Sequence, residues 1–358
     1  MLDNDTLFMP LVMALGSIST ALALSRGGSL VFAGAMGFGT LAAFISYTTQ
    51  LFDPIQQLAR ILAEMQSAQA SAERVIDLLD TQPDIVDSPE VEAEYGTAFA
   101  PRRGNWPPIA GGVEFRDVTF AYKTGETVLR DFNLKVEPGQ TIALVGETGA
   151  GKSTIVNLVC RFYEPTAGQV LIDGVDYRER SQLWLHSALG YVLQTPHLFS
   201  GSIADNIRYG NLDATDEEIV AAAQLAGADD FIRRLPDGYD TLIGGDGGSL
   251  SQGQRQLLSI ARAAVADPPV MILDEATSSI DTRTEAIVQA GMDGLMHGRT
   301  VFVIAHRLST IKSADLILVI RDGDIVEQGT HEELLALGGF YAELYNSQFT
   351  ETIDEVED

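Results

Sequence analysis

Basic residues and cysteine are scarce in this 358-residue chain. It has 23 Lys and Arg, only four of them Lys, against 50 Asp and Glu, so its formal net charge is −27. The overall field of so acidic a chain repels polyanions, which argues against nucleic acid as a partner. Cys160 stands alone, which excludes an internal disulfide and fits a reducing compartment. The length allows two or three compact units.

Charge is also nearly absent from the start of the chain. Leu7 to Leu24 and Gly27 to Phe52 carry no charged residue, and as helices they are about 27 to 39 Å long, enough to cross a ~30 Å hydrocarbon core. The short segment Ser25 to Gly28 predicts a tight turn between them. A signal peptide would begin with basic residues, whereas this start has Asp3 and Asp5. A buried hairpin of a soluble protein is the alternative, but two such spans in tandem favour a membrane hairpin.

The pattern along the chain predicts four zones. Residues 1–80 are a partial transmembrane domain, in which an amphipathic helix from Pro54 to Asp80 continues the second span. Residues 81–112 are rich in proline and predict a linker without secondary structure. Residues 113–349 form a soluble domain. Residues 350–358, TETIDEVED, predict an acidic disordered tail.

A glycine-rich loop stands between a strand-like and a helix-like segment. The run TIALV precedes GETGAGKST, and IVNLVCRFY follows at helical spacing. The glycines let successive backbone N–H groups converge on phosphates, the lysine reaches the terminal phosphates, and the serine offers a hydroxyl to Mg²⁺. These residues are Gly146, Gly149, Gly151, Lys152 and Ser153. A chance glycine turn is the alternative, and the correct flanks argue against it.

Three further apolar runs end in polar residues. VMILDE ends in Asp274, placed to hold a Mg²⁺-bound water, and Glu275, placed to act as general base or to orient water. TVFVIAH ends in His306, and YVLQ ends in Gln194. Ligands of open parallel sheets bind beyond the carboxyl ends of the strands, so Gly146, Asp274 and His306 are expected at one edge. Gln194 is a neutral amide of a kind that can reach Mg²⁺ or a water. A solvated strand end, a structural histidine and a surface-loop glutamine are the respective alternatives.

Two more segments bear on nucleotide binding. Tyr122 precedes the glycine-rich loop and either stacks on a base or packs on a strand face; the residues alone leave both open. The stretch GGSLSQGQRQLLSIARA, Gly247 to Ala263, predicts a helix N-terminus suited to an anion, with free N–H groups and a serine hydroxyl. The chain therefore has two candidate phosphate sites.

Taken together, these motifs resemble the nucleotide-binding domain of ABC transporters of the exporter kind. The carriers are GETGAGKST, the Gln194 loop, LSQGQRQ, ILDEATSSID and IAHRLSTI. At the front of the chain, Gly27 to Leu79 resembles the last two membrane helices of such exporters. The resemblance implies ATP and Mg²⁺ as cofactors and assigns a role to each matching position. These roles are adenine stacking for Tyr122, phosphate binding for Gly146 to Thr154 including Thr148 and Thr154, metal binding for Ser153, Gln194 and Asp274, catalysis for Glu275, Gln194 and His306, and a D-loop contact for Asp281.

The resemblance also explains the second phosphate site. In this family two nucleotide domains close head to tail, so Ser251, Gly253 and Gln254 are expected to hold the ATP of a partner half-transporter. The usual glycine is replaced by Gln252, and this departure beside a complete phosphate-loop side favours a heterodimer over a homodimer. The stretch IGGDGGS lacks the acid-plus-arginine pair common in exporters.

The expected fold is an α/β P-loop domain with a helical subdomain, tethered to an N-terminal transmembrane hairpin. The expected function is ATP hydrolysis coupled to export of a drug-, lipid- or peptide-like substrate, by a protein integral to the plasma membrane with its nucleotide domain in the cytoplasm. Half-transporters of this kind have six membrane helices and this chain has two spans, so a truncated chain is expected. A soluble ABC ATPase without a transport role and a catalytically idle structural half are the alternatives.

Overall fold

The computed structural model describes residues 4–347 except 124, 245–249, 275–281 and 306. The chain divides into two compact units, Met1–Asp84 and Ile85–Asp358, and each is described by itself.

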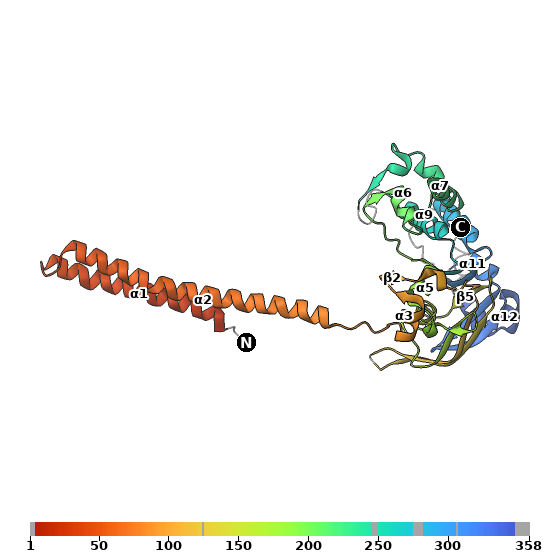
Figure 1. Ribbon diagram of the computed structural model, residues 1–358, viewed down its shortest axis with the longest axis horizontal. Coiled ribbons are helices and arrows are strands. Elements are labelled where there is room, and N and C mark those ends of the chain that lie inside the picture. Colours follow the sequence, from red (N-terminus) through yellow and green to blue (C-terminus); the bar gives the residue numbers. More distant parts are fainter. Residues whose placement is uncertain (1–3, 124, 245–249, 275–281, 306, 348–358) are drawn as a thin grey trace. The chain divides into compact units, whose positions relative to one another are not determined.

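The first unit is a hairpin of two long helices, α1 (Asn4–Phe32) and α2 (Phe38–Asp80), which lie side by side (Figure 1). The predicted turn at Ser25 to Gly28 is wrong, because α1 runs through it. Instead the chain turns at residues 33–37, where Gly34 has φ +71°. Gly27 serves packing: a Cβ there would lie 2.2 Å from Cδ1 of Leu41 on α2. Glycine at this position lets the two helices approach closely.

The shifted turn also divides the second predicted span. Among the described residues, one helix is long and apolar enough to cross a membrane, the Pro10–Phe32 part of α1. The charge-free part of α2 runs only from its start to Phe52, about 22 Å at 1.5 Å per residue. Beyond it α2 continues through Pro54 to Asp80, as the amphipathic pattern predicted. Both helices expose large apolar side chains, among them Leu11, Leu22, Phe44, Tyr47 and Leu51.

The centre of the second unit is a six-stranded sheet in the order β14-β13-β5-β12-β11-β8 (Figure 1). All neighbours are parallel except the β13–β14 pair. The strands are β5 (Thr141–Val145), β8 (Leu189–Val192), β11 (Val270–Asp274), β12 (Thr300–Ile304), β13 (Leu316–Arg321) and β14 (Asp324–Gly329). Their apolar runs are continuous because both faces are covered, as parallel sheets require.

Strand β5 shows how the two faces are used. Ile142 and Leu144 belong to one buried cluster, and Ala143 and Val145 belong to the other. The first cluster includes α4 (Lys152–Val159) and a four-stranded antiparallel sheet. That sheet has the order β4-β3-β6-β7 and consists of β3 (Val113–Ala121), β4 (Thr127–Val136), β6 (Ala167–Ile172) and β7 (Val175–Asp176).

The second cluster joins the parallel sheet to a helical lobe, coloured green and cyan in Figure 1. Within the lobe, α9 contacts both α6 and α7. Its helices are α6 (Ile203–Arg208), α7 (Asp216–Leu225), α8 (Asp229–Ile232) and α9 (Gln252–Ala266). The predicted P-loop α/β domain with a helical subdomain is thereby confirmed.

Shorter elements complete the second unit. The remaining helices are α5 (Gln182–Ser187), α10 (Thr282–Met296), α11 (Leu308–Ser313), α12 (His331–Leu337) and α13 (Phe340–Tyr345). Two short strands, β9 (Gly201–Ser202) and β10 (Leu242–Ile243), pair antiparallel. The predicted acidic tail lies outside the described residues.

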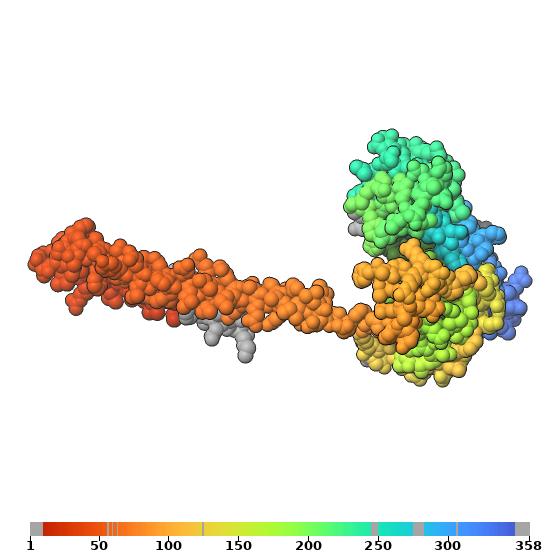
Figure 2. Space-filling model, viewed as in Figure 1, coloured from red at the N-terminus to blue at the C-terminus, as the bar shows by residue number. Residues whose placement is uncertain are grey.

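The segment after α2 has more structure than its proline content suggested. Residues 85–112 belong to the second unit and contain α3 (Pro89–Tyr95) and the paired strands β1 (Gly96–Thr97) and β2 (Ala100–Pro101). Ser88 caps α3 by accepting a hydrogen bond from the Val91 N–H, and a proline follows at the first helical position. In Figure 2 the orange atoms of this segment cover part of one face of the second unit. The expectation of a structureless linker therefore does not hold here.

Candidate nucleotide site

The carboxyl ends of the parallel strands bring the predicted motifs to one edge. Asp274, the last residue of β11, is level with Ile304 of β12, which in turn is level with Leu144 of β5. The glycine-rich loop begins two residues after Leu144. Leu273 is level with Val192, the last residue of β8, and Gln194 follows two residues later. The loop and Asp274 thus share an edge, as the strand pattern predicted, and Gln194 lies at the same edge.

The glycine-rich loop has a backbone that other residues rarely adopt. Gly146, Gly149 and Gly151 have φ angles of 153°, 86° and 108°, and Gly151 is the N-cap of α4. Helix α4 therefore starts at the loop with its unpaired N–H groups and the positive end of its dipole facing the sheet edge. This arrangement binds phosphates without specifying what they are attached to.

Lys152 is held at this edge, with its ammonium bonded to backbone oxygens. Its Nζ donates to the carbonyl oxygens of Gly146 and Glu147 at 2.7 and 2.8 Å. Burial lowers the pKa of Lys152, and the Asp274 carboxylate acts against that shift. The ammonium is thus close enough to Asp274 to feel its charge. A partly desolvated lysine at a helix N-terminus is well suited to neutralise terminal phosphates.

Tyr122 and Thr154 meet beside the phosphate-loop helix. The Tyr122 hydroxyl lies 3.0 Å from Oγ1 of Thr154. The Tyr122 ring meets the rings of Phe120 and Tyr163 edge to face, with centroids 4.9 and 5.3 Å apart. The sequence left two roles open for Tyr122, base stacking and packing on a strand face. The ring packs on its neighbours, and it also lies beside the glycine-rich loop, so both roles remain compatible with the structure. Adenine stacking by Tyr122 stays a prediction.

The expected metal ligands fit Mg²⁺. Ser153 is exposed on the first turn of α4, Gln194 is exposed beyond β8, and Asp274 is half-buried. Mg²⁺ is commonly held by one or two carboxylates together with substrate phosphates and waters. Asp274 provides one carboxylate of this kind, and the Ser153 hydroxyl adds a further oxygen donor. Glu275, Asp281 and His306 lie outside the described residues, so their predicted roles stay predictions.

The second candidate phosphate site lies at the N-terminus of α9. Ser251 Oγ accepts from the Gln254 N–H at 3.2 Å, and Gln254 Oε1 accepts from the Ser251 N–H at 2.9 Å. This reciprocal cap, readable from the S-x-x-Q spacing, leaves the Ser251 hydroxyl hydrogen to donate to a ligand. Gly253 is buried in the first turn. The predicted helix start is confirmed, and Gln254 is revealed as a capping residue.

Arg262, eight residues further along α9, is a residue whose role the sequence did not reveal. Its guanidinium donates to the carbonyl oxygens of Asn206 and His197 and to Oδ1 of Asn206, each at 2.9 Å. It also lies over the rings of Phe199 and Tyr209, 5.2 and 5.6 Å from their centroids. Desolvation lowers the pKa of Arg262. Arg262 thus joins α9 to the segment that follows Gln194. The sequence does not reveal this role, because the partners of Arg262 are about sixty residues away.

The comparison with known families shows the family to which the chain belongs. The family described as "ABC transporter" matches residues 129–278, from β4 past the end of β11. The chain belongs to the ABC transporter family. The matched residues lie in its second unit, which contains the ATP-binding domain of that family. Following the resemblance, the glycine-rich loop is called the Walker A loop, and α9 the signature helix.

Similar proteins extend the match through the first unit. An uncharacterised ABC transporter ATP-binding protein, YfiC of Bacillus subtilis, is 46% identical over 96% of this chain and 55% of its own length. A protein of Mycobacterium bovis named as a fatty acid ABC transporter ATP-binding/permease protein is 48% identical over 94% of this chain and 51% of its own length. The solved structure of a bacterial Atm1-family ABC exporter with ATP bound matches with a TM-score of 0.68 and 37% identity, over 96% of this chain and 57% of that chain. The chain spans about half the length of these relatives.

Proposed function

We propose that this chain binds and hydrolyses ATP as one half of an ABC exporter, and that hydrolysis drives transport across a membrane. The observation that carries the proposal is the shared sheet edge, where the Walker A loop, Lys152, Asp274 and Gln194 come together. The substrate is proposed to be drug-, lipid- or peptide-like. The name of the mycobacterial relative supports the lipid-like class.

The residues at this edge are assigned different roles in hydrolysis. Backbone N–H groups of the loop and the Lys152 ammonium neutralise the phosphates. Ser153, Asp274 and Gln194 would hold Mg²⁺, which when bound would supply neutralisation of phosphate charge. Glu275, directly after Asp274, is assigned to orient the attacking water and accept its proton. His306 is assigned a hydrogen bond to the γ-phosphate.

A dimer is part of the proposal, since the domain carries two half-sites. Lys152 lies at the start of α4 and Ser251 at the start of α9. Two domains arranged head to tail place each signature helix over the ATP on the other domain's Walker A loop. Both helix N-termini then face one nucleotide, and loss of the γ-phosphate removes the charge between them. ATP therefore favours the closed pair.

The surface that passes this motion to the membrane part is proposed to lie on the helical lobe. Phe199 and Tyr209 are 47% and 58% exposed, their rings lie 4.5 Å apart, and Arg262 supports both. Exposed aromatic side chains on a rigid base are typical of protein contacts. Because Arg262 belongs to α9 and contacts both rings, a displacement of this surface is passed directly to the signature helix.

Membrane fractionation combined with an ATPase assay tests the main proposal. We expect the chain to sediment with membranes through its first 80 residues, and the solubilised protein to hydrolyse ATP in the presence of Mg²⁺. A chain recovered in the supernatant after high-speed centrifugation would contradict the membrane part. A sedimenting, folded chain that binds no ATP would contradict the ATPase part.

The partner is tested with the hydrolysis-deficient Glu275→Gln chain. Under the heterodimer proposal, this variant stays monomeric when saturated with ATP and dimerises only with a second half-transporter whose signature is standard. Light scattering coupled to size exclusion measures the mass of the complex. Symmetric self-association with two occluded nucleotides per dimer would establish a homodimer instead. A Ser251→Arg chain, whose added side chain obstructs the signature site, is the control that should fail to associate in either case.

A further inference from the structure

A buried arginine joins the segment that follows α2 to the end of the Walker A helix. The Arg161 side chain is 2% exposed, and its Nη1 donates to Oδ1 of Asp87 at 3.0 Å. Asp87 is itself 16% exposed, and it comes seven residues after Asp80, the last residue of α2. The pair therefore links a position in the chain shortly after α2 with the interior of the ATP-binding domain.

Arg161 is the residue that ends α4. Its backbone is left-handed, with φ +53°, its N–H bonds to the Leu158 carbonyl, and the following N–H, of Phe162, bonds to the Asn157 carbonyl at 2.9 Å. Left-handed residues with this crossing of hydrogen bonds terminate helices. Because α4 begins with Lys152, the rigid helix connects Arg161 at one end to the Walker A loop at the other.

Asp87 has a second role on the other side of the pair. Both of its carboxylate oxygens accept from the Gln182 N–H, at 3.0 Å, and Ser181, the N-cap of α5, makes no side-chain cap of its own. One carboxylate thus caps α5 and holds the residue that ends α4. Displacement of the chain at Asp87 must move both helices or break a buried, charge-assisted contact.

We infer that Asp87 and Arg161 are positioning residues that couple the segment 85–112 to the Walker A loop, in addition to the coupling surface on the helical lobe. The inference rests on the proposed function, because it concerns ATP bound at that loop. Displacement of this segment is passed through Asp87 to Arg161 and along α4 to Lys152. By reciprocity, nucleotide binding at the loop alters the packing of the segment 85–112.

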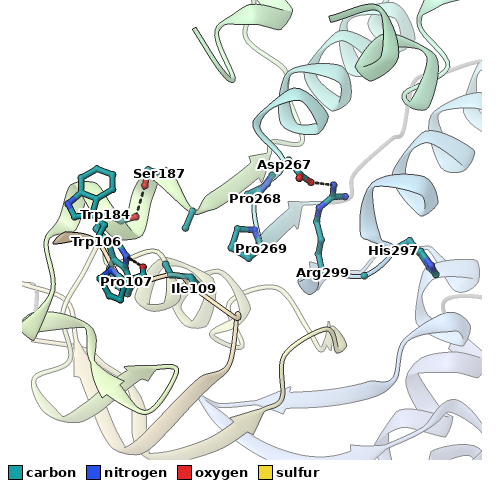
Figure 3. A pocket seen from close by; sticks show the side chains of 12 residues that line it. Trp106, Pro107, Ile109, Trp184, Ser187, Asp267, Pro268, Pro269, His297 and Arg299 are labelled. Carbon is teal, nitrogen blue, oxygen red and sulfur yellow. Dashed lines mark hydrogen bonds and ion pairs between the residues drawn. The ribbon is translucent and has the colours of Figure 1, made fainter. Parts of the chain in front are cut away.

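Both tryptophans of the chain report on this packing. Trp184 Nε1 donates to the Pro107 carbonyl at 2.7 Å, and the Arg103 guanidinium lies 5.7 Å from the centroid of Trp106. Figure 3 shows both side chains on one wall of a cavity of about 540 Å³ whose other wall is Pro268, Pro269 and Arg299. These wall residues precede β11 and β12, so the tryptophans lie at the amino edge of the sheet. A nucleotide at the carboxyl edge does not touch them.

The experiment is tryptophan emission of the full-length chain, titrated with a non-hydrolysable ATP analogue and Mg²⁺. Binding is measured independently by the anisotropy of a fluorescent nucleotide. We expect nucleotide to change the emission of the wild-type chain. In Asp87→Asn we expect that change to be lost, while affinity stays within about threefold, because Asp87 does not contact the Walker A loop. The variant is expected to fold, since Arg161 retains Glu164 and the carbonyls of Tyr177 and Arg180 as acceptors.

Glu94→Gln is the matched control, because it makes the same carboxylate-to-amide change on an exposed position of α3. It should respond to nucleotide like the wild type. A full emission response in folded Asp87→Asn would overturn the inference, and so would a wild-type chain that binds nucleotide without any response. The wild-type result stands even if the variant does not fold. Absence of nucleotide binding by the wild type would overturn the proposed function, and the inference with it.

Discussion

Replacing Glu275 with Gln should lower the rate of ATP hydrolysis by about 10²–10⁴, the usual contribution of a positioned general base. The substitution keeps the size of the side chain and removes the group that accepts the proton of the attacking water. Asp274 is untouched, so Mg²⁺ and ATP should still bind. Phosphate release and equilibrium nucleotide binding, measured on the same preparation, separate the two effects.

Lys152→Ala provides the contrast for this prediction. It removes the ammonium at the N-terminus of α4, which the structure holds at the Gly146 and Glu147 carbonyls. Charged hydrogen bonds of this kind contribute about 1.5–3 kcal/mol, so nucleotide affinity itself should fall by roughly 10- to 100-fold.

Hydrolysis by Glu275→Gln at a rate near that of the wild type would remove Glu275 from the catalytic role.

Substituting Gly146 with Ala should destabilise the ATP-binding domain and abolish nucleotide binding. A Cβ at this position would lie 2.2 Å from the carbonyl oxygen of Ile320 in the neighbouring strand β13. That contact is with backbone, which cannot move aside cheaply, and the φ of 153° adds strain. Overpacking of this kind costs about 1–3 kcal/mol or more. The apparent unfolding temperature, with and without ATP, measures the effect.

Gly149→Ala is the matched control for Gly146→Ala. Gly149 also has a positive φ, +86°, but no heavy atom lies within 4 Å of an added Cβ. Its cost should be limited to backbone strain, about 1–2 kcal/mol. We therefore expect a smaller drop in unfolding temperature than for Gly146→Ala. Equal unfolding temperatures for Gly146→Ala and the wild type would show that β13 does not restrict the loop.

The helical hairpin of the first unit shows where the sequence pattern misleads. In the first unit, the sequence analysis predicted a turn at Ser25 to Gly28, because this segment separates two charge-free runs and has two glycines after an arginine. The helix continues there because Gly27 faces Leu41 of α2, a residue fourteen positions away. Glycine signals a turn when only local backbone preference is considered. Glycine also allows two helices to pack closely, as Gly27 does here against Leu41. The sequence does not show which residue of another helix a glycine faces.

By itself, the sequence determined where the glycine-rich loop, the strand ends and the capped helix starts lie along the chain. The Walker A loop, Asp274, Gln194 and the start of α9 at Ser251 were all placed correctly, because each depends on a local signal: glycine spacing, the end of an apolar run, or a helix cap. Such signals need no knowledge of distant contacts.

Only the tertiary structure decided how these parts are connected. Arg262 meets Asn206 and Phe199, and Arg161 meets Asp87, seventy-four positions earlier in the chain. An arginine in a helical pattern reads as a solvated side chain, and a proline-rich stretch reads as a linker. Their roles arise because burial removes water and forces each charge to find a partner. Which carboxylate or carbonyl is within reach is fixed by packing, and no spacing in the sequence encodes it.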